Sequence, residues 1–194
     1  MNAVDFLLLR YRDLHRGFVH DLPARLSESQ IRGRPQPGVN TIAWLLWHAA
    51  RVEDVGVNRF ITDGRQVFHD GWTERLAVSR RDVGTGMTGA EVDDLSAVID
   101  LPALRGYWEA VMARTAAVVE TLRYATLDDP VPADRVERTV SEEGVVAAGA
   151  EWLTEFWGAG RSRGWFLAQL PSLHVYGHYF EAQVVAGLWG VAGR

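Results

Sequence analysis

The stretch "NTIAWLLWHAARVED", residues 40–54, predicts a long amphipathic helix and is the point from which the fold can be worked out. Asn40 is a plausible N-cap residue, and the apolar pattern continues to Ile61 before "TDG". The apolar residues recur at the spacing of one helix face: Ile42, Leu45, Leu46, Ala49, Val52, Gly56 and Phe60. His48 lies in mid-helix between tryptophans, at the edge of this apolar arc.

Three other segments show the same period near 3.6 residues, over residues 3–21, about 100–122 and about 162–189. The third of the four helices opens at Asp100 with Pro102 in its first turn. No stretch alternates as a strand does. Four long helices in 194 residues predict an all-α fold, a four-helix bundle that forms a single domain over residues 1–194.

The connections between these helices are long and uneven. Within residues 62–99, "TGAE" (88–91) matches a capping box and predicts a short extra helix. A second short helix is expected in "AAGAEWLTEFW" (147–157), whereas "LPARLSESQIRGRPQPG" (22–38) is expected to be a loop. We expect the tryptophans of the connections to pack over the bundle: Trp72, Trp152 and Trp157. Pro171 predicts either a bend or a restart in the last helix.

The composition excludes several kinds of site. There are no cysteines, so disulfides, thiolate metal sites and cysteine nucleophiles are excluded. All 20 basic residues are arginine, which excludes Schiff-base lysine chemistry and suggests a GC-rich genome. A net charge of -5 without a basic cluster argues against nucleic-acid binding. No apolar run reaches the length of a membrane span, and the start does not resemble a secretory signal, so we expect a cytoplasmic protein.

Three of the six histidines are candidate metal ligands. His174 and His178 stand four residues apart and share one face of the last helix, and His48 faces the core from another helix. Together they could hold a divalent ion and leave positions open for water or substrate. Spacing alone leaves an equally ordinary interpretation, polar residues at the edge of an apolar face. For the other three histidines we expect a surface or capping role: His15, His20 and His69.

Two further residues are candidates for a role in catalysis. Glu181, one turn after His178, could be a fourth ligand, an acceptor that holds an imidazole, a general base or an ordinary surface residue. Arg51 could bind a substrate carboxylate, although a solvated position beside Asp54 is the favoured interpretation.

The pattern resembles the DinB-like (DinB/YfiT) superfamily. The resemblance is carried by residues 40–54, by "LHVYGHYFEAQVVAG" (173–187) and by the connection "DGW…GTGMTGAEVDDL" from Asp70 to Leu95. The family motif of one histidine in the second helix and H-x3-H in the last is matched by His48, His174 and His178. The resemblance implies an up-down-down-up bundle, a divalent zinc, nickel or iron ion on the three histidines, and a homodimer. Relatives often carry Gln where this chain has Glu181.

The resemblance also implies a class of reaction. The family includes mycothiol-dependent maleylpyruvate isomerase and bacillithiol transferase, which use a low-molecular-weight thiol. The leading hypothesis is therefore a metal-dependent thiol S-transferase or isomerase, with mycothiol as a possible co-substrate and a small electrophile as the other substrate. The alternatives are a metal-dependent hydrolase and a non-catalytic metal-binding stress protein, since one fold hosts many activities.

Overall fold

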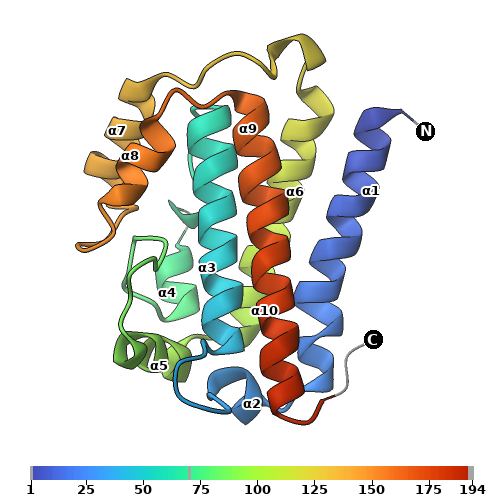
Figure 1. Ribbon diagram of the computed structural model, residues 1–194, viewed down its shortest axis with the longest axis vertical. Helices are drawn as coiled ribbons and strands as arrows, with labels where there is room; N and C mark the ends of the chain where they lie inside the picture. The colour runs from blue at the N-terminus through green and yellow to red at the C-terminus, as the bar shows by residue number, and fades with distance from the viewer. Residues whose placement is uncertain (1, 70, 192–194) are drawn as a thin grey trace.

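The computed structural model describes residues 2–69 and 71–191, and four long helical segments lie side by side in it (Figure 1). Each segment is built from one or more pieces: α1 (Ala3–Arg16) with η1 (Gly17–Asp21), α3 (Ile42–Asp54) with η3 (Val55–Ile61), α6 (Leu101–Thr121), and α9 (Arg163–Ala168) with η6 (Gln169–His174) and α10 (Val175–Leu188). The pieces η1, η3 and η6 are π-helical. Neighbours in the ring are α1 and α6, α6 and α3, α3 and α10, and α10 and α1. In Figure 1, α1 and α10 run one way and α3 and α6 the other, which confirms the all-α, up-down-down-up bundle.

Five short helices lie in the connections: α2 (Glu28–Arg32), α4 (Trp72–Leu76), α5 (Gly89–Val98), α7 (Ala133–Glu143) and α8 (Trp152–Gly158). Single 3-10 turns complete them: η2 (Pro23–Arg25), η4 (Val67–His69) and η5 (Tyr124–Thr126). The prediction of α5 from its capping box and that of α8 are confirmed. The expected loop over residues 22–38 is wrong in part, because Ser27 and Gln30 form a capping box that starts α2. Asp70, where the DinB-like connection begins, lies outside the described residues, as do both ends of the predicted 1–194 domain.

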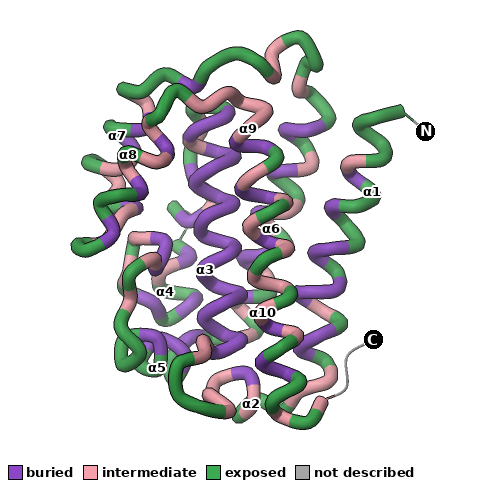
Figure 2. Tube along the Cα trace, viewed as in Figure 1, coloured by how far each residue is buried: buried purple, intermediate pink, exposed green. Residues whose placement is uncertain are grey.

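α3 is buried on every side, not on one face as its amphipathic pattern suggested. All 13 of its residues are buried, and in Figure 2 it is purple along its length. The bundle covers its inner face, while α2, α5 and η4 pack against it from the connections. A helix surrounded in this way must find an internal partner for each of its polar side chains.

Arg51 and Asp54 are the first such pair: the expected position of Arg51 beside Asp54 is confirmed, but the expected solvation is wrong. Arg51 is 1% exposed, so it neither faces solvent nor meets a substrate carboxylate. Its guanidinium donates to Gln66 (2.7 Å), to Tyr107 (3.2 Å) and to the carbonyl of Arg81 (2.7 Å), and it lies 3.5 Å from the Asp54 carboxylate. These contacts attach the connection after α3 to the helix itself.

His15 is also buried, where a surface or capping role was expected. Its Nδ1–H donates to the carbonyl of Tyr11 (2.7 Å), and its Nε2 lies 2.8 Å from the Glu53 carboxylate. The other oxygen of Glu53 accepts from the hydroxyls of Tyr11 and Thr115. Burial, together with the charge of Glu53, raises the pKa of Tyr11 well above its usual value. The cluster joins α1, α3 and α6 and does not include the other histidines; His20 is half-buried and His69 is exposed.

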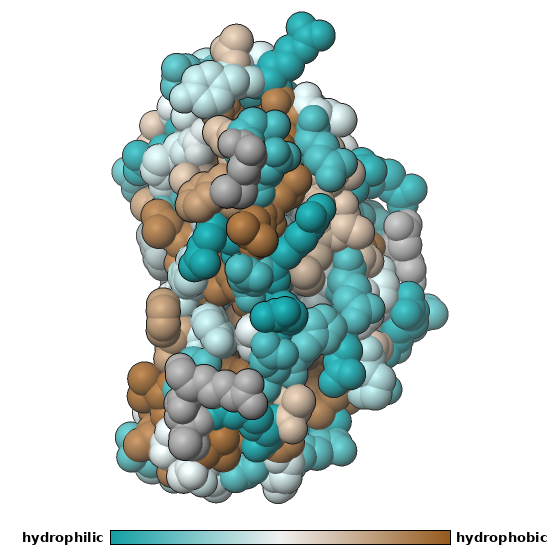
Figure 3. Space-filling model, turned by 90° about the vertical axis from the view of Figure 1, so that its right-hand side faces the viewer, coloured by the Kyte–Doolittle hydropathy of each residue, from teal (hydrophilic) through white to brown (hydrophobic). Residues whose placement is uncertain are grey.

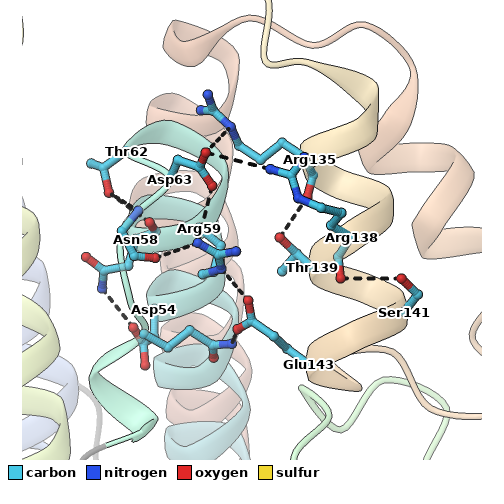
Figure 4. Close-up of polar contacts among 12 residues, drawn as sticks. Asp54, Asn58, Arg59, Thr62, Asp63, Arg135, Arg138, Thr139, Ser141 and Glu143 are labelled. Atoms are coloured by element: carbon cyan, nitrogen blue, oxygen red, sulfur yellow. Dashed lines mark hydrogen bonds and ion pairs between the residues drawn. The ribbon is translucent and has the colours of Figure 1, made fainter.

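α7 is fastened to the end of η3 by arginine–carboxylate contacts (Figure 4). Arg59 bonds to Glu143, and Arg135 and Arg138 lie 3.6 and 3.7 Å from Asp63. Because α8 packs on α7, these contacts also hold α8 beside the bundle. Of the three tryptophans expected to pack inward, Trp72 and Trp157 are buried, whereas Trp152 is 57% exposed and that prediction is wrong.

The surface carries apolar side chains on α10 and α1. The larger ones on the last helical segment are Leu173, Phe180, Val184 and Leu188, and those on α1 include Phe6 and Leu9. Figure 3 faces the α1 side and shows apolar patches broken by hydrophilic side chains. The homodimer stays a prediction. Among the described residues, none of the helices combines the length and the apolar character that a membrane crossing requires.

Gly56 allows η3 and η6 to approach closely. A Cβ at this position would overlap Cδ1 of Leu170 and lie 3.1 Å from its Cβ, so a side chain here would push the two helical segments apart. Gly177, in α10, has open space where a Cβ would stand.

We expect Gly56→Ala to lower the free energy of unfolding by about 1–3 kcal/mol through overpacking. Gly177→Ala is the matched control and should raise it by about 0.5–1 kcal/mol, the usual gain from glycine to alanine within a helix. Urea denaturation in the presence of a chelator measures both. Equal effects of the two substitutions would show that the approach of Leu170 to Gly56 does not limit packing.

Candidate metal centre

The structure brings the three predicted histidines together between two neighbouring helical segments. His48 extends from α3, and His174 and His178 come from the junction of η6 and α10, which lies alongside α3 (Figure 1). The Nε2 atom of His174 lies 3.2 Å from that of His48 and 3.1 Å from that of His178. The ligand atoms of the three all lie within 4.8 Å of one another.

The spacing of these nitrogen atoms fits a divalent metal ion. Nitrogens held about 2.0–2.1 Å from one ion lie about 2.8–3.4 Å apart, with facial octahedral coordination at the lower end and tetrahedral coordination at the upper end. The two shortest separations fall in that interval. Three imidazoles do not complete either coordination shell, so the set leaves room for a further ligand.

Hydrogen bonds on the far side of two rings determine which nitrogen carries the lone pair. The Nδ1–H of His48 donates to the carbonyl of Val83, and the Nδ1–H of His178 donates to Glu181 (3.0 Å). With the proton on Nδ1, the Nε2 atom of each ring is a bare electron pair directed into the cluster. Among the described residues, Nδ1 of His174 is buried without a partner. Two converging lone pairs repel each other unless a cation, or a shared proton, lies between them.

Glu181 is the residue that orients His178. One of its oxygens accepts from His178, and the other accepts from Asn40 Nδ2 at 2.8 Å. Burial would raise the pKa of Glu181, but the hydrogen bonds from His178 and Asn40 outweigh it, so the pKa is lowered. Both oxygens are therefore occupied, and the carboxylate belongs to the support of the cluster. A buried or half-buried carboxylate behind a ligating histidine is a common arrangement in metal sites.

Asn40 was expected to cap the helix, and that prediction is wrong by one residue. Thr41 is the N-cap, and its hydroxyl accepts from the backbone N–H of Trp44 (3.1 Å). Asn40 is thereby free to hold Glu181, which is 141 positions away in the sequence. Sequence reasoning missed this support, since only the packing of α10 on α3 brings the two side chains together.

The surroundings of His48 and His174 keep both rings neutral. Burial and the neighbouring His178 lower the pKa of His48 to about 3, and Trp44 stacks on the ring with centroids 4.6 Å apart. Burial, with His48 and His178, lowers the pKa of His174 well below its usual value. Neutral imidazole is the form that binds a metal ion. At neutral pH both rings are already in this form, so metal binding does not require either of them to release a proton.

The π-helical segment η6 places His174 at the cluster. Pro171, where we expected a bend or a restart, lies inside this segment, and the helix continues through it. A π-helix closes hydrogen bonds over five residues, so it aligns residues five apart, whereas an α-helix would turn them away from each other. Gln169 and His174 consequently line one cavity of about 320 Å³, which also has His48 in its wall.

The lowered pKa of His48 predicts that the metal-free protein loses stability in mild acid. The neutral His48 ring contributes its full stability above about pH 6.5, the pKa of a free imidazole. That contribution is lost as the pH falls toward about 3, the pKa of His48 in the folded protein, because the unfolded chain takes up a proton on this histidine first. Between pH 7 and pH 5 we expect wild type to lose about 2 kcal/mol more unfolding free energy than His48→Gln does. Denaturant unfolding with chelator at both pH values measures the difference, and parallel losses in the two proteins would contradict it.

Comparisons with known proteins agree with this architecture. A family model described as the DinB superfamily matches residues 13–153, which include His48 but end before His174 and His178. The crystal structure of a conserved protein from Enterococcus faecalis is similar over 96% of this chain and 99% of that chain, with 17% identity and a TM-score of 0.67. At that identity the likeness shows the fold alone. No curated protein matches the sequence. The matched residues make up well over half of the chain, and the protein therefore belongs to the DinB superfamily.

Proposed function

We propose that the protein is a metal-dependent enzyme that transfers or isomerises through a low-molecular-weight thiol, with a divalent ion on His48, His174 and His178. The observation that carries the proposal is the convergence of three Nε2 atoms, two of them from histidines that line a cavity. The ion would be zinc, nickel or iron, since imidazole suits each of them. When bound, it supplies Lewis acidity that lowers the pKa of a coordinated thiol or water.

The protein's own residues prepare the site for such a ligand. Three neutral imidazoles leave the charge of the ion uncancelled, which favours an anionic fourth ligand such as a thiolate. Glu181 and the carbonyl of Val83 hold two of the rings in place, so that binding requires little rearrangement. A proton released by a bound thiol would pass to solvent, because no carboxylate is among the described residues that line the cavity.

The same lining favours thiol transfer over hydrolysis. A hydrolase needs a base that takes a proton from water or aligns it, and Glu181, which accepts from Asn40 and His178, is not among the described residues that line the cavity. The cavity wall is mostly aromatic and aliphatic, which suits a soft sulfur nucleophile and an apolar substrate. These features support the transferase as the first activity to test, with mycothiol as the thiol.

We expect the purified protein to accelerate the reaction of mycothiol with 1-chloro-2,4-dinitrobenzene, and chelation to abolish this acceleration until a divalent ion is restored. His174→Ala should lower kcat/KM at least about 100-fold, since it removes a ligand from the centre. His69→Ala, an exposed histidine outside the cluster, is the matched control and should behave as wild type. Thiol consumption followed by absorbance measures each rate. Turnover that survives both chelation and His174→Ala would contradict the proposal.

A further inference from the structure

The cavity beside the candidate metal centre has a wall that is mostly aromatic and aliphatic. It measures about 320 Å³, within the range of small-molecule sites, and lies between α8 on one side and α3 and η6 on the other. Its lining consists of His48, Val52, Thr85, Trp152, Leu153, Phe156, Trp157, Gln169, Leu170 and His174.

α8 contributes the aromatic part of that wall. Trp152 and Phe156 are one helical turn apart and meet edge to face, with ring centroids 6.1 Å apart at 61°. Phe156 is supported from behind by Trp165 (5.4 Å, 68°), and the guanidinium of Arg161 stacks on Trp165 at 4.7 Å. Trp152 itself is 57% exposed, which is an unusual position for the largest apolar side chain. The rings are thus held in position by the protein while one of them remains free to contact a ligand.

Among the described residues that form the lining, none carries a charged side chain, so any charge would come from the two histidines and their ion. Glu151, just before α8, and Glu155, within it, line a different depression, between α8 and α7, so their negative charge is directed away from the cavity. Arg51, which could have bound a substrate carboxylate, is buried and donates instead to Gln66 and to the carbonyl of Arg81. Away from the ion itself, an anionic substrate would lose hydration in this cavity without gaining a protein cation in exchange.

Two neutral polar side chains complete the cavity. Among the described residues, neither the amide of Gln169 nor the hydroxyl of Thr85 has a hydrogen-bond partner, although both line the space. A few uncommitted polar groups in an otherwise apolar wall are what orients a small ligand. They can donate to or accept from a carbonyl, hydroxyl or nitro group without requiring charge on it.

We propose that this cavity binds the electrophilic substrate, and that this substrate is a neutral molecule with a flat aromatic body. The body lies against Trp152 and Phe156, a neutral polar group meets Gln169 or Thr85, and the reactive end points toward His48 and His174. The inference rests on the proposed function for the role of the ligand, but not for its binding. The proposed neutral substrate differs from the anionic substrate that a carboxylate-binding role for Arg51 would have implied.

The test compares two ligands of the same shape and different charge, naphthalene-2-carboxamide and naphthalene-2-carboxylate. Isothermal titration calorimetry on the full-length protein, as purified and again with chelator, gives the dissociation constants. With chelator, we expect the neutral amide to bind about tenfold or more tightly than the carboxylate, because only the carboxylate loses charge hydration. Equal affinities, or no binding of the amide at millimolar concentration, would overturn the proposal.

Two variants locate the binding. Trp152→Ala removes an exposed ring, so folding is preserved, and it should weaken the amide about tenfold by removing the stacking surface. Tyr124→Ala, a still more exposed aromatic residue outside the cavity lining, is the control and should leave the affinity unchanged. Unchanged affinity in Trp152→Ala would place the ligand elsewhere and reject the inference.

The outcome also separates this inference from the proposed function. Selective binding of the amide that depends on Trp152, without thiol transfer to any electrophile, would sustain the cavity and refute the transferase. Thiol transfer to anionic electrophiles at a rate unaffected by Trp152→Ala would sustain the transferase and refute the aromatic substrate. The binding measurement needs no active enzyme, so the two results do not depend on each other.

Discussion

The complete burial of α3 is the constraint on which the rest of the structure depends. A polar group removed from water costs free energy unless another group in the protein bonds to it. α3 carries His48, Arg51, Glu53 and Asp54 into the interior, and each bonds to a residue outside α3. Glu53 bonds to α1 and α6, Asp54 and Arg51 hold the connection that follows, and His48 bonds to the carbonyl of Val83. The helix that forms the centre of the core thus also fixes the positions of the elements around it.

The candidate metal centre is one more consequence of that burial. His48 stays neutral because it lies in the interior, and its bond to Val83 turns the lone pair of Nε2 toward His174 and His178. Across the cluster, Glu181, held by Asn40, accepts from Nδ1 of His178 and so turns the Nε2 lone pair of that ring inward. The geometry of the centre is therefore set before any ion arrives, which reduces the reorganisation that binding requires. The π-helical segment around Pro171 adds the third ring and, one π-turn earlier, Gln169 of the adjoining cavity.

Sequence periodicity predicted the four long helices and the short helices α5 and α8, because an apolar stripe and a capping box are local signals. Spacing alone left the three histidines ambiguous, and it was the resemblance to the DinB-like family that predicted His48, His174 and His178 as one set, which the structure brings together. Periodicity failed for Arg51 and His15, since a pattern along one helix does not reveal that connections far away in the sequence cover its other face. The short helices α4 and α7 were missed for a related reason: they are stabilised mainly by packing on other helices. α2 was missed although it begins at a capping box, Ser27 with Gln30, which is a local signal. The bond from Asn40 to Glu181 is a contact between distant segments, so only the folded arrangement discloses it.

The central claim is that His48, His174 and His178 hold one divalent ion. The most direct test is the metal content of untagged protein, measured by elemental mass spectrometry for wild type and for His48→Ala, with His69→Ala as the control. His48 is the decisive position, because it comes from α3 and shares no helix with the other two ligands. We expect about one ion per chain in wild type and in His69→Ala, and little in His48→Ala, because two imidazoles alone hold a divalent ion weakly. A full equivalent of metal retained by His48→Ala, or a wild-type protein that takes up none when a divalent ion is supplied, would contradict it.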